Sequence, residues 1–141
     1  MLAFLSELKK RNKLLFRFGW FCQAGVIFCM IQFQRDATFV AGINAWIKPL
    51  KFFLSIAVFS WTMAWLLYHL EAQRKVRVFS LMVVLVLLFE LAVITWQAAN
   101  GRLSHFNTST VLYSSLFTIM GIAISLLTVW TFIIGLKFWG P

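Results

Sequence analysis

Four long apolar stretches dominate the chain, and shorter polar segments separate them. They run approximately over residues 14–34, 50–70, 76–97 and 111–136. A helix needs about 20 mostly apolar residues to cross the hydrocarbon core of a bilayer, so each stretch is long enough to span it. The stretches are continuous and do not alternate in segments of about ten residues, which favours helices over a membrane β-barrel. We therefore expect an all-α integral membrane protein, with a single domain over residues 1–141 folded as a four-transmembrane-helix bundle.

The first residues have a different pattern, which combines apolar and basic side chains at helical spacing. Leu5 and Leu8 are followed by Lys9, Lys10 and Lys13. This amphipathic pattern is typical of a short helix in the membrane interface, which we expect over about residues 2–12. No small-residue cleavage site closes the first apolar stretch, so we expect a retained first span and not a signal peptide.

Composition and charge support this assignment and indicate an orientation. Hydrophobic residues make up 62% of the chain and charged residues 12%, far from the balance of a soluble domain. With four spans, nine of the 13 Lys and Arg residues lie on the side of the termini. The positive-inside rule then places both termini in the cytoplasm. The basic residues lie at span ends, where topology and attraction to anionic membrane lipids explain them, so we predict no nucleic-acid binding.

One acidic residue interrupts the third apolar stretch. Glu90 lies in the run from Val78 to Trp96, which has no other charge, and Gln97 follows seven residues later on the same helical face. A charge in hydrocarbon costs at least about 2–3 kcal/mol, so such residues usually face a bundle interior and find a partner. Lys51 and Arg102 are the candidate partners. A structural ion pair and a functional carboxylate, which carries a proton or contacts a ligand, remain open alternatives.

Polar residues also form stripes on two other stretches. In the second stretch Lys48, Lys51, Ser55, Thr62 and His69 share one helical face, which we expect to point inward. In the fourth stretch, small or hydroxylated residues recur at positions 110, 114, 118, 121, 125 and 128. Close helix packing explains the pattern in the fourth stretch, and the alternative is that these residues line a hydrated path.

The two loops on the non-cytoplasmic side contain turn signals and further polar residues. Pro49 is suited to the first turn of a helix, and Asn100-Gly101 predicts a left-handed cap at the end of the third helix. These loops and the adjoining helix ends supply the candidate ligand-binding residues Asn44, Trp46, Lys48, Lys51, Gln97, Arg102, Ser104 and Asn107. Glu90 and His105 are the candidates for proton transfer.

No strong catalytic or cofactor-binding motif is present. The chain has no H-E-x-x-H, no G-x-S-x-G and no glycine-rich phosphate loop. Two histidines and four acidic residues provide few candidate ligands for a metal site made only of protein groups, and we predict no such site. Haem ligation by His105 alone stays open. The sequence identifies no cofactor and does not decide whether the protein is an enzyme.

Two segments carry a resemblance to a group of small bacterial four-span membrane proteins. These are N-A-W-I-K-P-L-K-F over residues 44–52 and Q-A-A-N-G-R-L-S-H-F-N over residues 97–107. They resemble patterns of the type N-P-W-I-K-P-L-K-F and Q-A-A-R-G-x-x-S-H-F-N, with a glutamate upstream of the second. The chain departs from these patterns at Ala45 and Asn100. The resemblance implies a four-helix fold, a bacterial inner-membrane location and a site formed by these segments, but no activity.

The sequence thus predicts a polar pocket that opens on the periplasmic side. We expect it to bind an amphipathic or anionic small molecule or lipid. Whether it also processes this ligand stays an open alternative. A proton-coupled transporter or channel, formed as a homo-oligomer around Glu90, is a second hypothesis. A third is an accessory subunit of a larger membrane complex.

Overall fold

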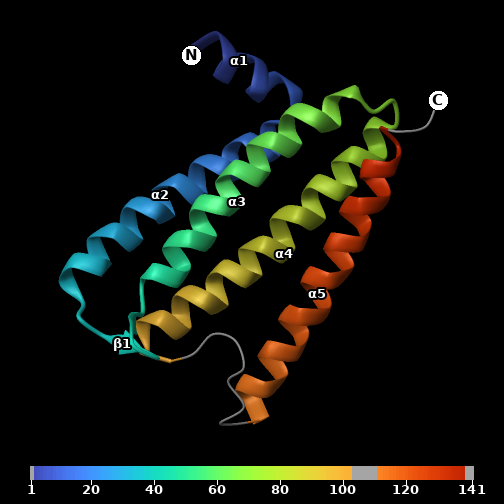
Figure 1. The fold of residues 1–141 in the computed structure, drawn as a ribbon. Coiled ribbons are helices and arrows are strands. Elements are labelled where there is room, and N and C mark those ends of the chain that lie inside the picture. Colours follow the sequence, from blue (N-terminus) through green and yellow to red (C-terminus); the bar gives the residue numbers. More distant parts are fainter. Residues whose placement is uncertain (1, 103–110, 139–141) are drawn as a thin grey trace.

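The computed structural model describes residues 2–102 and 111–138, and shows an elongated bundle of four long helices (Figure 1). These are α2 (Lys13–Arg35), α3 (Ile47–Leu66), α4 (Gln73–Ala99) and α5 (Val111–Leu136). A shorter helix, α1 (Leu2–Arg11), precedes them, and a 3₁₀ turn, η1 (Leu67–His69), extends α3. Strands β1 (Phe39–Val40) and β2 (Ile43–Asn44) form a small hairpin between α2 and α3.

The four spans agree with the apolar stretches of the sequence. All four helices are long and apolar enough to cross a membrane, with α3 and η1 counted together. The strands lie at one end of the bundle, here called the hairpin end. The helix α1, η1 and the C-terminal end of α5 lie at the other end, here called the terminal end (Figure 1).

The predicted N-terminal helix is present and packs onto the bundle. Leu8 is fully buried, and α1 contacts both α2 and α3. Asn12 separates α1 from α2 and caps α2, because its Oδ1 accepts a hydrogen bond from the Leu15 N–H at 3.1 Å. Its Nδ2 also donates to Ser80 Oγ of α4 at 2.8 Å, so the elbow between α1 and α2 is tied to a third helix.

One arginine anchors α1 to the end of α3. Arg11 donates to Glu7 Oε1 (3.1 Å) and to the Trp65 carbonyl (3.3 Å). Its guanidinium also stacks over the Trp65 ring at 3.7 Å and lies 3.1 Å from His69 Nε2. An arginine donates but cannot accept, so His69 Nε2 must be the acceptor in this contact.

The α2–α3 interface is the closest in the bundle because two glycines admit aromatic rings. A Cβ atom at Gly19 would overlap the Trp61 indole, and one at Gly25 would overlap the Phe53 ring. The Trp61 ring is also held in place, because its Nε1 donates to the Phe16 carbonyl at 3.3 Å. Small residues let helices approach closely in membranes, where van der Waals packing replaces the hydrophobic effect.

The helix α5 packs differently, along a single line. Its buried residues are Tyr113, Met120, Leu127 and Ile134, spaced seven apart. Seven residues are almost two helical turns, so these side chains form one narrow stripe. Most of the other residues of α5 are exposed, for example Leu126 and Phe132.

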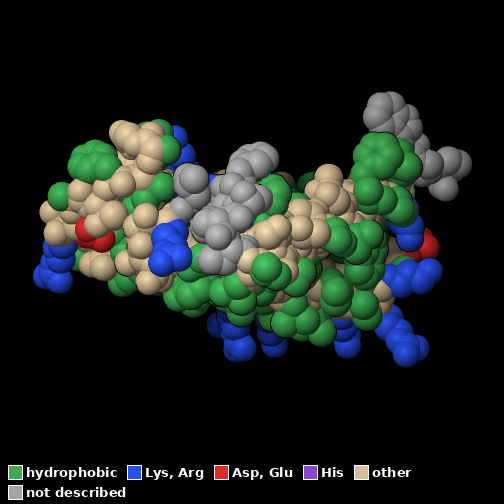
Figure 2. Space-filling view, turned by 90° about the horizontal axis from the view of Figure 1, so that it is seen from below, with side chains coloured by type: hydrophobic (Ala, Val, Ile, Leu, Met, Phe, Trp, Pro, Cys, Tyr) green, Lys and Arg blue, Asp and Glu red, His purple; other side chains and the backbone are tan. Residues whose placement is uncertain are grey.

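Large hydrophobic side chains cover much of the outer surface of the long helices (Figure 2). Soluble monomers rarely expose apolar patches of this extent, whereas lipid-facing helices do. The surface is therefore suited to a hydrocarbon environment.

Candidate ligand-binding pocket

Asp36 organises the connection between α2 and α3. Its Oδ1 accepts from both the N–H and the hydroxyl of Thr38, and its Oδ2 accepts from Trp46 Nε1 at 2.9 Å. These hydrogen bonds lower the pKa of the Asp36 carboxyl below its usual range, with the Thr38 hydroxyl contributing most, then the Trp46 indole and then the Thr38 N–H. The ionised side chain thus joins the end of α2 to the start of α3.

Asn44 completes the same network. Its Nδ2 donates to the Asp36 carbonyl (2.8 Å), while its Oδ1 accepts from the Trp46 N–H (2.9 Å). Asp36 and Asn44 both bind the backbone two residues ahead, a local pattern that Asp and Asn favour in turns. The sequence analysis overlooked Asp36, although the D-x-T spacing of residues 36–38 was the available signal.

The two strands form a tight turn that the sequence analysis did not predict. Phe39 pairs with Asn44 and Val40 pairs with Ile43. The central residues Ala41 and Gly42 have φ of 51° and 80°, the left-handed pair that a type I′ turn requires. Ala41 is an unusual residue at the first of these positions, since Asn or Asp is the common choice, and this explains why the hairpin was missed.

A pocket of about 330 Å³ lies beside this connection. The hairpin forms one side, the start of α3 forms another, and the C-terminal part of α4 contributes Ile94 and Ala98. The volume falls within the range of small-molecule sites. Most of the lining is apolar, while Asn44, Lys48, Lys51 and Arg102 bring polar groups to it.

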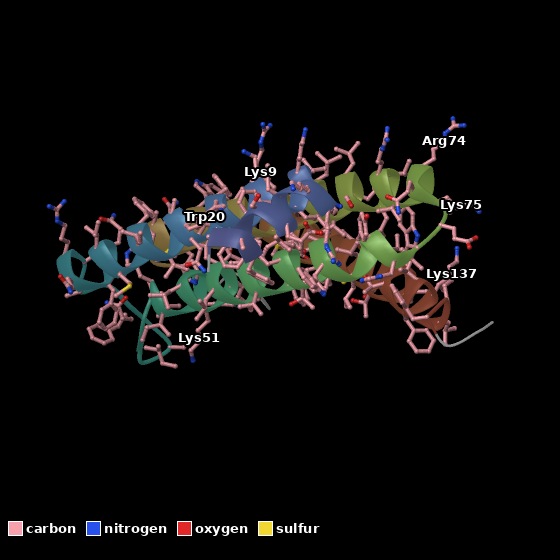
Figure 3. All side chains as sticks on the ribbon, turned by 90° about the horizontal axis from the view of Figure 1, so that it is seen from above. Lys9, Trp20, Lys51, Arg74, Lys75 and Lys137 are labelled. Carbon is pink, nitrogen blue, oxygen red and sulfur yellow. The ribbon has the colours of Figure 1, made fainter. Side chains whose placement is uncertain are left out.

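The three cations at the pocket differ in their surroundings. Lys48 is half-buried, and Lys51 is exposed and points away from the bundle (Figure 3). Arg102 is exposed and donates from Nη1 to the Tyr113 hydroxyl at 2.9 Å. It follows a left-handed Gly101 (φ 61°), whose N–H donates to the Ala98 carbonyl. The predicted glycine cap of this helix is confirmed, and so is Pro49 in the first turn of α3.

Two buried acceptors lie on α4 close to this pocket. Glu90 is 3% exposed and Gln97 is 1% exposed. The Oε1 atom of each has no hydrogen-bond partner in the described part of the chain. Glu90 precedes the pocket residues Ile94 and Ala98 by one and two turns on the same helical face, about 6 Å and 12 Å along the axis. The predicted shared face of Glu90 and Gln97 is confirmed as a buried face.

The ion pair considered for Glu90, with Lys51 or Arg102, is not formed. The ion pair found among residues 2–102 and 111–138 joins Glu7 to Arg11. Lys51 is exposed and points outward, and Arg102 donates to Tyr113 instead of reaching Glu90. Of the two alternatives for Glu90, the structural ion pair with these cations is therefore excluded.

The inward orientation predicted for the polar stripe of α3 is also wrong. Lys51, Ser55, Thr62 and His69 are exposed, and only Lys48 is half-buried. The Ser55 hydroxyl donates to the Phe52 carbonyl, and the Thr62 hydroxyl donates to the Val58 carbonyl. Because their own backbone satisfies these hydroxyls, they need no polar interior.

The hydroxyl stripe of α5 follows the same rule. Thr118, Ser125 and Thr128 each donate to the carbonyl four residues earlier, at 2.7–2.9 Å. All three residues are exposed, as is Gly121. The stripe therefore lies on the outer surface of the single chain.

The remaining candidate residues divide into two groups. Trp46 is 2% exposed and does not line the pocket, since its indole N–H is bound by Asp36. Ser104, His105 and Asn107 lie outside the described residues. A role for these three in binding or proton transfer stays a prediction.

Comparison with protein-family models, with curated proteins and with solved structures finds no match for this chain.

Proposed function

We propose that this chain is a multi-pass inner-membrane protein, with both termini in the cytoplasm, whose hairpin-end pocket binds an amphipathic anionic molecule from the periplasmic side. The four apolar helices and the apolar surface support the membrane placement. The excess of Lys and Arg at the terminal end supports the orientation. Both rest on physical rules of membrane insertion.

The observation that carries the proposal is an apolar pocket with cations at its edge, beside which two unpartnered acceptors are buried on α4. The lining residues Ile94, Ala98 and Phe52 suit a hydrocarbon tail, and Lys48 suits a carboxylate or phosphate. Each unsatisfied polar group in a membrane interior costs several kcal/mol. The Oε1 atoms of Glu90 and Gln97 are therefore suited to a hydrogen-bond donor, such as a hydroxyl or water that accompanies the ligand.

The transporter hypothesis is less well supported. As a homo-oligomer it needs Glu90 to face a path between copies of the chain, but Glu90 is buried inside the single bundle. The interior of α4 on the terminal side of Glu90 presents Leu87 and Val83 before the buried Ser80, and Phe79 follows it. Access from one side only favours binding over transport. No contact of the described residues favours the accessory-subunit hypothesis.

A pair of adjacent alanines gives a direct test. Ala98 lines the pocket, whereas Ala99 is exposed on the same turn of α4. Dodecyl phosphate is a suitable probe, measured by titration calorimetry on protein in nanodiscs of zwitterionic lipid. We expect Ala98→Phe to abolish saturable binding and Ala99→Phe to leave it unchanged, because only the first substitution fills the pocket.

Charge recognition is tested with the same probe. Lys48→Gln is expected to weaken dodecyl phosphate binding about fivefold, on the basis of roughly 1 kcal/mol for each basic residue. Arg17→Gln removes one charge from an exposed position outside the pocket and serves as the control. Equal binding of dodecyl trimethylammonium, or equal affinity of the two alanine variants, would contradict the proposal.

A further inference from the structure

The terminal end contains a second cavity, distinct from the hairpin-end pocket. It has a volume of about 800 Å³ and lies between the start of α4 and the end of α5. One part of its lining is basic, with Arg74, Lys75 and Lys137, and these three lie at the same end of the bundle (Figure 3). The other part is apolar and includes Trp130 and Ile133.

The charge of this lining is unbalanced. Three cations face one carboxylate, Glu71. Within the described ranges, the side chains of Arg74, Lys75 and Lys137 form no hydrogen bond or ion pair, and all three residues are exposed. Three cations that line one cavity with a single carboxylate attract an anion, and a phosphate near a membrane surface gains about 1 kcal/mol for each basic residue.

The apolar part of this cavity lies beside the line along which α5 contacts the bundle. Trp130 and Ile133 of α5 and Val78 of α4 belong to it. A further cavity of about 500 Å³, with Leu127 and Phe132 in its lining, lies on the opposite flank of that line, against α3. The basic cavity is therefore a separate groove between α4 and α5, which exists because α5 touches the bundle along one narrow line.

We propose that this groove is a binding site for an anionic glycerophospholipid. Arg74, Lys75 and Lys137 hold the phosphate at the terminal end, and an acyl chain lies along α4 and α5 against Trp130 and Ile133. A free phosphate fits the basic part alone, and a neutral lipid fits the apolar part alone. Only an anionic lipid satisfies both. The site is independent of the hairpin-end pocket.

Native mass spectrometry of the full chain in detergent, with phosphatidylglycerol or phosphatidylcholine added, tests this inference. We expect retained phosphatidylglycerol adducts on the wild-type protein and at least fivefold fewer on Lys75→Gln/Lys137→Gln. Lys9→Gln/Arg17→Gln loses the same charge at two exposed residues outside the cavity and should retain the adducts. Thermal unfolding of each variant in detergent confirms that it is folded.

Three results would overturn the proposal. Equal adduct loss in both double variants would show a general effect of surface charge. Equal retention of phosphatidylcholine would show that the headgroup is not recognised. Displacement of phosphatidylglycerol by inorganic phosphate alone, at equal concentration, would show an anion site in which the acyl chain has no part.

Discussion

The bundle consists of two helical hairpins, α2–α3 and α4–α5, which are packed to very different degrees. In the first, glycines admit the rings of Trp61 and Phe53, and the connection is hydrogen-bonded through Asp36. In the second, α5 touches the bundle at every seventh residue, and Arg102 bonded to Tyr113 joins the two helices. The second helical hairpin is the longer and more apolar of the two but the more loosely packed, so hydrophobicity alone does not decide how closely helices pack.

The difference separates two kinds of site. The hairpin-end pocket is formed largely by the firmly packed unit, because the strands and the start of α3 supply most of its lining. The groove proposed for lipid lies along the loosely packed unit, where a narrow contact leaves apolar space beside it. A close interface positions polar groups, and a sparse interface leaves room for a hydrocarbon chain.

The strongest test of this contrast replaces one glycine in each helical hairpin by leucine. Gly19→Leu forces a side chain into the Trp61 indole and should destabilise the protein by about 3 kcal/mol. Gly121→Leu adds the same side chain to α5, where an added Cβ would meet nothing within 4 Å. Thermal unfolding in detergent is expected to show a large decrease in Tm for the first variant and no decrease for the second. Equal decreases would contradict the contrast.

A smaller effect is expected at the junction of α4 with α5. Tyr113→Phe removes the hydroxyl that accepts from Arg102 and should cost about 1 kcal/mol. Hydrogen exchange measured by mass spectrometry should accelerate about fivefold in the first turns of α5, with α2 and α3 unchanged. Tyr68→Phe is the matched control, because its exposed ring loses a hydroxyl with no recorded partner among the described residues. Faster exchange throughout the bundle would instead indicate that both hairpins depend on this contact.

The smallest effect is a pH dependence of the Asp36 hydrogen bonds in the connection between α2 and α3. The folded pKa of Asp36 is depressed, so its stabilisation is complete above the usual carboxyl pKa of 3.8 and is lost as the pH falls through the lower, folded value. The indole N–H resonance of Trp46 should stay constant from pH 7 to about pH 5 and move only below about pH 4. The indole N–H of Trp61, which donates to a backbone carbonyl, serves as the internal reference. A Trp46 resonance that titrates near pH 6, or one that moves together with that of Trp61, would contradict the assignment of Asp36 as its acceptor.

Much of the architecture followed from the sequence. The four spans, the N-terminal helix, the glycine cap at Gly101 and the position of Pro49 were all predicted. These features depend on local composition or on the geometry of one or two residues. Of the predicted binding residues, Asn44, Lys48, Lys51 and Arg102 line the pocket, whereas Trp46 and Gln97 do not.

The errors share one cause. The sequence shows which residues lie on a common helical face, but not toward which neighbour that face turns. For this reason Lys51 was considered as a partner of Glu90, and the polar stripe of α3 was expected to point inward. Hydroxyls that bind their own backbone add to the difficulty, because Ser55 and Thr62 count as polar in the sequence while their hydrogen bonds are already formed.

By itself, then, the sequence determined the number, length and apolar character of the helices, because a bilayer requires about 20 apolar residues for each span. Only the tertiary structure decided which faces meet. It placed Asp36 between Thr38 and Trp46, buried Glu90 one turn from the pocket, and left the groove along α5 open. The physical reason is that a bilayer favours apolar side chains equally on every face of a helix. The rotation of each helix about its axis is instead fixed by close contacts such as that of Gly19 with Trp61, which form between residues far apart in the chain.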